Sequence, residues 1–270
     1  MEFSIGKLSE SFELSTEALR YYERKGLLSP KRRDGSTFRV YEFLDVVRIS
    51  TIKRYQNMGL SLEEICRLYE PFDLKGLLEC VEEKHDALKA EIAFKQALSE
   101  RMDDIIKRME KIDGVLLKPE LISGGTYCVA EYRDSEHMAK SLLKDPAIRK
   151  LFAKMPITST TSIIPRAMSE GHGGEIKRGV VFEERFAPLL KLPKQSEKIL
   201  RRITAERFVR CAFLLINGAY RAEELMEVAA PFVRENGLTV CDDMFTIQLL
   251  NYCNDDGENY HYTDLMIPVE

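Results

Sequence analysis

Hydrophobic residues recur at intervals of three and four through residues 1–70, a spacing typical of short amphipathic helices. Four helices are predicted there: Ser4–Ser11, Thr16–Lys25, Phe43–Asn57 and Leu62–Glu70. Ser15 or Thr16 caps the second helix, because a hydroxyl oxygen accepts the free amide hydrogens at a helix start. Ser61 and Glu64 have the spacing of a capping box that begins the fourth helix. Between the second and third helices, Asp34-Gly35 predicts the turn of a small β-hairpin.

A long helix is predicted next, over residues 72–113. Its stripe alternates by three and four and shifts phase once: Leu78, Val81, His85, Leu88, Ile92 and Lys95, then Leu98, Met102, Ile105, Met109 and Ile112. Such a stripe is typical of a coiled-coil seam, and the phase shift is typical of a stutter. A helix of about 35 residues extends roughly 50 Å, more than one small domain can cover. We therefore expect it to pair two chains, rather than to pack on its own domain.

After Gly114 and Lys118-Pro119 the pattern changes to one of strands with two helices. The predicted strands are Tyr127–Tyr132, Thr158–Ile164, Gly179–Phe186, Phe208–Ile216, Met244–Tyr252 and Tyr262–Val269. The predicted helices are Ser135–Lys154 and Arg221–Glu235. This order contains two strand–helix–strand–strand units in tandem. We therefore expect an α+β protein whose last part is one antiparallel sheet with two helices.

Positive charge is concentrated around the second helix. The whole chain has a net charge of −4, whereas residues 18–58 carry ten Lys and Arg against four acids, a local charge of +6. Such a concentration is typical of a surface that contacts the phosphates of DNA. The candidate phosphate contacts are Arg24, Lys25, Arg32, Arg33, Arg39 and Arg54, with the Tyr21 and Tyr41 hydroxyls as neutral donors. The outward face of the second helix offers Thr16, Glu17 and Arg20 to base edges in the major groove.

Composition narrows the function classes. The chain has 270 residues, 44% hydrophobic and 31% charged, which suits two globular domains. No run approaches the roughly 20 apolar residues of a membrane span, and the first ten residues lack the layout of a secretory signal. We therefore expect a cytoplasmic protein with no membrane contact. The six cysteines lack zinc-clip spacing, so they predict reduced thiols, no metal site and no cofactor.

The last 34 residues are acidic and aromatic. Residues 237–270 contain seven acids and no Lys or Arg. Aromatic residues lie between these acids: Phe245, Tyr252, Tyr260 and Tyr262. Carboxylates beside aromatic rings are the groups that attract a lipophilic cation. An acidic surface over an aromatic core is an equally good interpretation of any one of these acids.

Several motifs in the first 70 residues resemble the MerR family of transcription regulators. They are SIGKLSE, LRYYERKGLL, the Arg-x-Tyr of Arg39 and Tyr41, and KRYQNMGLSLEEI, in that order and spacing. The resemblance implies a winged helix-turn-helix domain over residues 1–71, with DNA-contact roles for the second helix and the wing arginine. It also implies an antiparallel dimer helix over 72–117 that spaces two DNA-binding heads. Family members distort promoter DNA so that its elements realign for RNA polymerase holoenzyme.

The order of elements over 118–270 resembles the GyrI-like effector-binding domain of the BmrR-like multidrug-sensing subgroup. This resemblance implies a drug pocket with Tyr260 and Glu258 at its rim. Its walls would be Phe182, Phe208, Phe213 and Phe245. Phe245 stands where those sensors carry a buried glutamate. The remaining candidates for an acid that pairs with a cation are Glu183, Glu184 and Asp243.

Two other interpretations compete with a ligand-responsive regulator. Metal- or redox-sensing relatives place a cysteine cluster near the end of the dimer helix, and Lys107–Lys118 contains no cysteine. GyrI-like folds also host hydrolases. Adjacent residues of a strand point to opposite faces, so Glu183 and Glu184 make a poor acid–base pair. We therefore expect no catalytic residues. Instead, we expect a homodimeric regulator that binds promoter DNA and a hydrophobic cation and that activates transcription.

Overall fold

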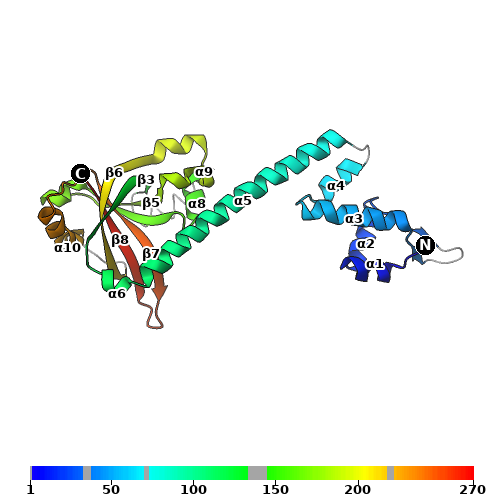
Figure 1. Ribbon diagram of the computed structural model, residues 1–270, viewed down its shortest axis with the longest axis horizontal. Coiled ribbons are helices and arrows are strands. Elements are labelled where there is room, and N and C mark those ends of the chain that lie inside the picture. Colours follow the sequence, from blue (N-terminus) through cyan, green and yellow to red (C-terminus); the bar gives the residue numbers. More distant parts are fainter. Residues whose placement is uncertain (1, 33–37, 70–72, 133–144, 218–221) are drawn as a thin grey trace. The chain divides into compact units, whose positions relative to one another are not determined.

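The structure is a computed structural model that describes residues 2–32, 38–69, 73–132, 145–217 and 222–270 (Figure 1). The chain forms two compact units, Met1–Ile92 (unit 1) and Ala93–Glu270 (unit 2). The domain limits expected at residues 71 and 117 stay predictions. No helix within the described ranges is long and apolar enough to cross a membrane.

Unit 1 contains the four predicted helices. They are α1 (Ile5–Phe12), α2 (Thr16–Arg24), α3 (Phe43–Asn57) and α4 (Leu62–Tyr69). The Ser15 side chain accepts a hydrogen bond from the Ala18 amide at 3.0 Å, which confirms it as the cap of α2. The capping box of α4 is also confirmed, because Ser61 N donates to Glu64 at 2.7 Å and Glu64 N donates to Ser61 at 3.2 Å.

A two-stranded wing follows α2. Strands β1 (Lys31–Arg32) and β2 (Arg39–Val40) pair antiparallel, which confirms the predicted hairpin. The predicted Asp34-Gly35 turn and Arg33 lie outside the described residues. The wing and the helices share one core, since buried side chains of α2, α3 and α4 form one cluster with Tyr41 at the end of the wing.

The long helix α5 (Leu74–Met109) belongs partly to each unit. It ends four residues before the predicted limit, and a short helix α6 (Ile112–Val115) follows. Ala97 and Ile105 are buried, so the second half of α5 packs on its own unit, which was not predicted. Other apolar positions of α5 are exposed: Leu74, Leu78, Leu88, Ile92, Met102 and Ile106. Pairing of two chains through α5 stays a prediction.

Unit 2 is a closed six-stranded barrel in the order β3-β5-β4-β7-β8-β6, with every neighbouring pair antiparallel (Figure 1). The strands are β3 (Glu120–Tyr132), β4 (Ser159–Ile164), β5 (Lys177–Glu183), β6 (Leu200–Ile216), β7 (Met244–Cys253) and β8 (Asn259–Val269). Helix α8 (Pro146–Phe152) lies within the predicted helix Ser135–Lys154, of which residues 135–144 are outside the described residues. Helix α10 (Ala222–Glu235) follows β6. The tandem strand–helix–strand–strand order is therefore confirmed. Closure into a barrel was not predicted.

Two long strands close the barrel. β3 pairs with both β5 and β6, and β6 pairs with both β3 and β8. A Cβ on Gly124 of β3 would come within 2.0 Å of the Ala205 carbonyl oxygen of β6, so the close approach of these strands requires glycine there. The sequence pattern missed the first half of β6. The predicted strand end at 184–186 was also wrong, since Glu184–Phe186 is a 3₁₀ turn.

Three buried clusters divide unit 2 into layers. One cluster lies inside the barrel and includes Phe208, Phe245 and Met266. A second packs the outer face of β6 and β8 against α10. The third packs β3 and β5 against α8, the short helix α9 (Ala187–Leu190) and the second half of α5, which contributes Ala97. Because strand side chains alternate between faces, each strand serves the interior and one outer layer.

Candidate nucleic-acid interface and ligand pocket

The outward face of α2 carries charged side chains that form ion pairs with one another. Glu17 pairs with Arg24 at 2.8 Å and with Arg20 at 3.6 Å, and all three are exposed. The hydrogen bond from Arg24 holds the pKa of Glu17 below its ordinary value. Arg24 and Lys25 both lie 5.6 Å from the centre of the Tyr21 ring, within reach of a cation–π attraction. The predicted contacts of α2 therefore form one surface cluster, with Thr16 half-buried at its start.

The wing arginines share one carboxylate. Glu23 of α2 pairs with Arg39 at 2.5 Å and with Arg32 at 3.6 Å. Lys31 pairs with Glu42 at 2.7 Å, and this bond raises the pKa of Lys31. Acids next to basic side chains hold them in one orientation, and they also reduce the local positive potential that phosphates meet. The basic side chains of the wing are therefore held in fixed orientations. The positive potential of this surface is lower than the number of its Lys and Arg residues implies, because Glu23 and Glu42 pair with them.

Tyr41 lies inside unit 1. Its side chain is fully buried, and its hydroxyl has no hydrogen-bond partner among the described residues. Burial raises the pKa of this hydroxyl. The Tyr41 backbone exchanges two hydrogen bonds with Phe3, at 2.9 and 3.0 Å, which ties the wing to the start of the chain. In this structure the hydroxyl does not reach the surface, whereas Arg54 of α3 is exposed.

Unit 2 contains a cavity of about 400 Å³ between the second half of α5 and the barrel. Its charged lining residues are Arg101, Asp104, Lys107, Arg108, Lys111, Glu120, Glu183, Arg210 and Asp264. Its remaining lining residues are Val115, Ile122, Tyr127, Ile247, Leu249 and Met266. The volume is in the range of sites that hold drug-sized ligands. The side toward α5 is therefore charged, whereas the barrel contributes five uncharged residues together with Glu120, Glu183, Arg210 and Asp264.

An ion-pair network forms part of the cavity lining. Arg108 of α5 pairs with Asp264 of β8 at 2.5 Å and with Glu120 of β3 at 2.7 Å. Arg210 of β6 pairs with the same Glu120 at 2.8 Å. Burial raises the pKa of Asp264, and the neighbouring Arg108 opposes that shift. The Arg108 Nε is buried and has no hydrogen-bond partner among the described residues.

An aromatic group lies beside the network. The Tyr127 ring is 5.4 Å from Phe208 in an edge-on arrangement and 4.9 Å from Phe245, and burial raises the pKa of Tyr127 to about 12. Phe208 and Phe245 are fully buried in the barrel interior. The structure therefore brings these two predicted wall residues together, packed against Tyr127, although neither is among the residues that line the cavity.

The other predicted ligand residues are dispersed. Phe182 lies in the cluster under α8 and α9, and Phe213 lies in the cluster under α10. Glu183 lines the cavity, but it pairs with Arg185 at 2.6 Å. Tyr260 donates to Glu258 at 2.8 Å and stacks on Tyr252 with 4.8 Å between ring centres, near the tip of the β7–β8 hairpin. Glu258 and Tyr260 are not among the residues that line the cavity.

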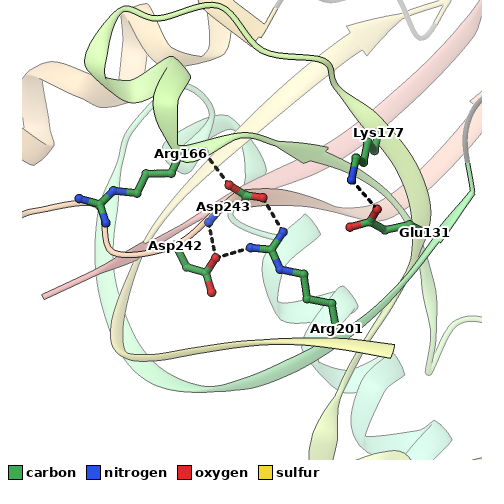
Figure 2. A network of polar contacts seen from close by, with 6 residues as sticks. All are labelled: Glu131, Arg166, Lys177, Arg201, Asp242 and Asp243. Atoms are coloured by element: carbon green, nitrogen blue, oxygen red, sulfur yellow. Dashed lines mark hydrogen bonds and ion pairs between the residues drawn. The ribbon is translucent and has the colours of Figure 1, made fainter. Parts of the chain in front are cut away.

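Asp243 has a structural environment of its own, shown in Figure 2. Its carboxylate pairs with Arg201 at 2.5 Å and accepts a hydrogen bond from the Arg166 amide at 2.8 Å. Asp242 pairs with the same Arg201, and Lys177 pairs with Glu131 nearby (Figure 2). Asp243 therefore joins the start of β6 to the segment after β4. It is not among the residues that line the cavity.

The sequence analysis missed the residues that dominate the cavity. Arg108, Glu120, Tyr127 and Arg210 were not named as candidates, and Asp264 was counted only as one acid in an acidic stretch. Alternation along β8 puts Asp264 on the same side as Met266, which is a usable signal. Arg108 has no such signal, because a basic residue in an amphipathic helix is typical of a solvated face.

The described residues offer no obvious metal site. They contain no group of three or more His, Cys, Asp or Glu that could hold an ion. All six cysteines are free, and burial raises the pKa of the Cys211 thiol to about 12.

Comparison with known proteins gives one family and several partial relatives. Residues 3–70 match the family described as MerR HTH family regulatory protein. The chain is 31% identical over 111 residues to the uncharacterized HTH-type transcriptional regulator YyaN of Bacillus subtilis, covering 41% of this chain and 75% of that protein. It is 27% identical over 110 residues to the multidrug-efflux transporter 1 regulator of Bacillus subtilis, covering 40% and 39%.

Most of these similarities cover only part of the relative. The chain spans about half the length of most of the curated relatives that it matches. Among solved structures, it is similar to a chain of the EcmrR–DNA complex in EcmrR-RPo, studied by cryo-electron microscopy. That similarity has 12% sequence identity, a coverage of 99% of both chains and a TM-score of 0.37.

Proposed function

Because the chain belongs to the MerR family of helix-turn-helix regulators, we propose that it regulates transcription from promoter DNA in response to a small molecule. Unit 1 binds the DNA, and a homodimer presents two such units to the two halves of the site. The dimer distorts the duplex so that promoter elements realign for RNA polymerase holoenzyme, and it thereby activates transcription. Such a regulator acts at the chromosome, in the cytoplasm.

The DNA-binding part of the proposal is supported by the surface of α2 and the wing. Arg20, Arg24 and Lys25 are exposed on one side of unit 1, and the wing adds Arg32 and Arg39. Helices in this position read bases through the major groove, while basic side chains contact the backbone. The candidate base contacts, Thr16, Glu17 and Arg20, remain a proposal, as do the phosphate contacts.

The dimer is supported by the apolar residues of α5 that the single chain leaves in solvent. Leu78, Leu88 and Ile92 are 56%, 55% and 49% exposed. Their spacing continues the predicted coiled-coil stripe, and burial of such a stripe against a second helix is favourable by roughly 25 cal/mol per Å² of apolar surface. A second copy of α5, running antiparallel, is the occupant that the family resemblance implies.

The response to a small molecule is the finer part of the proposal, and the cavity in unit 2 carries it. A cavity of about 400 Å³ with an apolar side and a charged side is suited to an organic ligand. The lipophilic cation expected from the acidic C-terminal stretch stays a prediction. Glu258 and Tyr260, on which it rested, do not line this cavity. A ligand shifts the regulator between states only through different affinities for those states.

A metal or redox sensor and a hydrolase were the alternatives. No observation among the described residues favours the sensor, since no group of potential metal ligands occurs there. Three of the four acids that line the cavity are engaged: Glu120 and Asp264 pair with arginines of the network, and Glu183 pairs with Arg185. This pairing leaves them poorly suited to act as a general base.

The experiment is a duplex selection with the purified full chain. We expect it to sediment as a dimer and to enrich one pseudo-palindromic sequence from a random duplex library. Arg24→Ala should weaken binding of that duplex and reduce the slope of log affinity against log salt by about one. Arg234→Ala is the matched control, because Arg234 is an exposed arginine at the end of α10 in unit 2. A monomer that enriches no sequence would contradict the proposal.

A further inference from the structure

The cavity of unit 2 is lined by more cations than acids. Five basic side chains line it: Arg101, Lys107, Arg108, Lys111 and Arg210. Four acids line it: Asp104, Glu120, Glu183 and Asp264. Four of the basic residues come from α5 and the turn after it, so the positive charge faces the barrel from one side.

Most of the acids are already neutralised. Asp264 and Glu120 pair with Arg108 and Arg210, and Glu183 pairs with Arg185, which is not among the lining residues. Asp104 is exposed to solvent. A cationic ligand that approached Asp264 would have to displace Arg108, which is only 13% exposed, and a buried charge that loses its partner is costly.

Three of the basic residues are not neutralised. Within the described residues, Arg101, Lys107 and Lys111 have no carboxylate partner, and the Arg101 Nε donates instead to the Pro156 carbonyl oxygen at 3.4 Å. Among the acids that line the cavity, only Asp104 lacks a basic partner in the described residues and can offset these three positive charges. The unbalanced charge at this side of the cavity is therefore positive.

Arg108 adds an independent observation. A guanidinium has five N–H donors, and two of its nitrogens are engaged by Glu120 and Asp264. The third, Nε, is buried and has no acceptor among the described residues, and the Arg108 side chain to which it belongs lines the cavity. A buried N–H without an acceptor is costly, so an acceptor oxygen supplied by a ligand would be favoured here.

The side chains from β7 and β8 determine which kind of nonpolar group a ligand can place in the cavity. Ile247, Leu249 and Met266 line it from β7 and β8, and the Tyr127 ring stands beside them. Apolar and aromatic walls gain free energy from an apolar ligand body, whereas charged groups of the opposite sign orient its polar end.

We propose that the cavity of unit 2 binds an amphipathic organic anion, such as an aromatic carboxylic or sulfonic acid. The acidic group is received by Arg101, Lys107, Lys111 and the Nε of Arg108, and the apolar body lies against Ile247, Leu249 and Met266. This inference rests on the proposed function of unit 2 as a ligand sensor and assigns its ligand class. Because the receiving cations belong to α5 and its continuation, the anion acts directly on the helix that is proposed to pair the two chains.

The test uses two fluorescent probes with the same apolar body. The anion 1-anilinonaphthalene-8-sulfonate should bind the full-length dimer saturably, at one site per chain. N-phenyl-1-naphthylamine, which lacks the sulfonate, should bind at least about tenfold more weakly. Naphthalene-acetate should displace the anionic probe, whereas its amide and tetraphenylphosphonium should not. Tighter binding of the cation than of the acids would overturn the inference, and so would failure of every acid to bind.

Variants locate the site. Lys107 and Lys111 are exposed, so Lys107→Gln and Lys111→Gln should fold normally and should each weaken probe binding about threefold. Lys95→Gln is the matched control, since Lys95 is an exposed lysine of α5 that does not line the cavity. Equal effects of all three substitutions would overturn the inference. Duplex binding by the same preparations, measured without ligand, separates this failure from failure of the proposed function.

Discussion

Arg108 of α5 and Asp264 of β8 form an ion pair of 2.5 Å in which the side chains are only 13% and 5% exposed. The two residues are 156 positions apart in the sequence. Their pairing attaches the second half of the long helix to the barrel and forms part of the cavity lining. The stability of unit 2 and the ligand binding proposed for its cavity therefore involve the same guanidinium.

Loss of Arg108 should destabilise unit 2 strongly. Arg108→Met leaves the buried Asp264 carboxylate without a partner, and removal of one member of a buried pair costs about 3–5 kcal/mol. The double variant Arg108→Met, Asp264→Leu should be more stable than Arg108→Met alone, because no buried charge is then left unpaired. Denaturant unfolding of the single and double variants measures this coupling. Strictly additive changes would show that the pair contributes no interaction energy.

Tyr41→Phe should stabilise unit 1 or leave it unchanged. The Tyr41 hydroxyl is buried without a partner among the described residues, and such a group costs about 1–3 kcal/mol. Its removal should therefore raise the unfolding free energy by about 1 kcal/mol. The affinity for a selected duplex should not change, because the hydroxyl does not reach the surface.

Tyr21→Phe is the comparison for this test, since Tyr21 is partly exposed and lies beside Arg24 and Lys25. If Tyr41→Phe bound DNA more weakly, the Tyr41 hydroxyl would have to contact a phosphate, as the sequence analysis predicted.

Arg39→Ala should weaken duplex binding and reduce the salt-dependence slope by about 0.9, the value for one lost phosphate contact. Glu23→Gln should act in the opposite direction. It removes the carboxylate that pairs with Arg39 at 2.5 Å and with Arg32 at 3.6 Å. Fluorescence anisotropy over a range of salt concentrations measures both. An unchanged slope for Arg39→Ala would exclude Arg39 as a phosphate contact.

The stability of unit 1 should depend on pH through Glu64. The hydrogen bond from Lys84 and those with Ser61 lower the pKa of Glu64 from 4.5 to about 2. A carboxyl whose folded pKa is depressed stabilises the fold above its unfolded pKa and loses that contribution as the pH falls through the folded pKa. Glu64→Gln should therefore unfold at a lower temperature than the native chain at pH 7. The difference should shrink as the pH falls from 4.5 toward 2.

The matched variant is Lys84→Gln, which removes the partner at 2.8 Å and leaves the capping box in place. It should show the same trend with pH. A difference that stays constant from pH 7 to pH 3 would assign the effect of Glu64→Gln to helix capping rather than to charge.

Local signals in the sequence determined unit 1 almost completely. The caps Ser15 and Ser61 lie where predicted, Gly26 follows α2 with a φ of 75°, and α3 has the predicted limits Phe43–Asn57. Each signal depends on residues within one turn of its element, so it can be read along the chain. The family resemblance of residues 3–70 depends on the same local motifs and is confirmed.

Tertiary structure alone decided the chemistry of unit 2. The order of strands and helices was readable because alternation is also local. Closure of the barrel depends on the pairing of β3 with β6, which lie far apart in the sequence, and neither segment records that pairing by itself. The same holds for the cavity: Arg108 reads as a surface charge of an amphipathic helix and Asp264 as one acid in an acidic stretch. Only folding excludes water from both and joins them, since an ion pair depends on distance in space and not on distance along the chain.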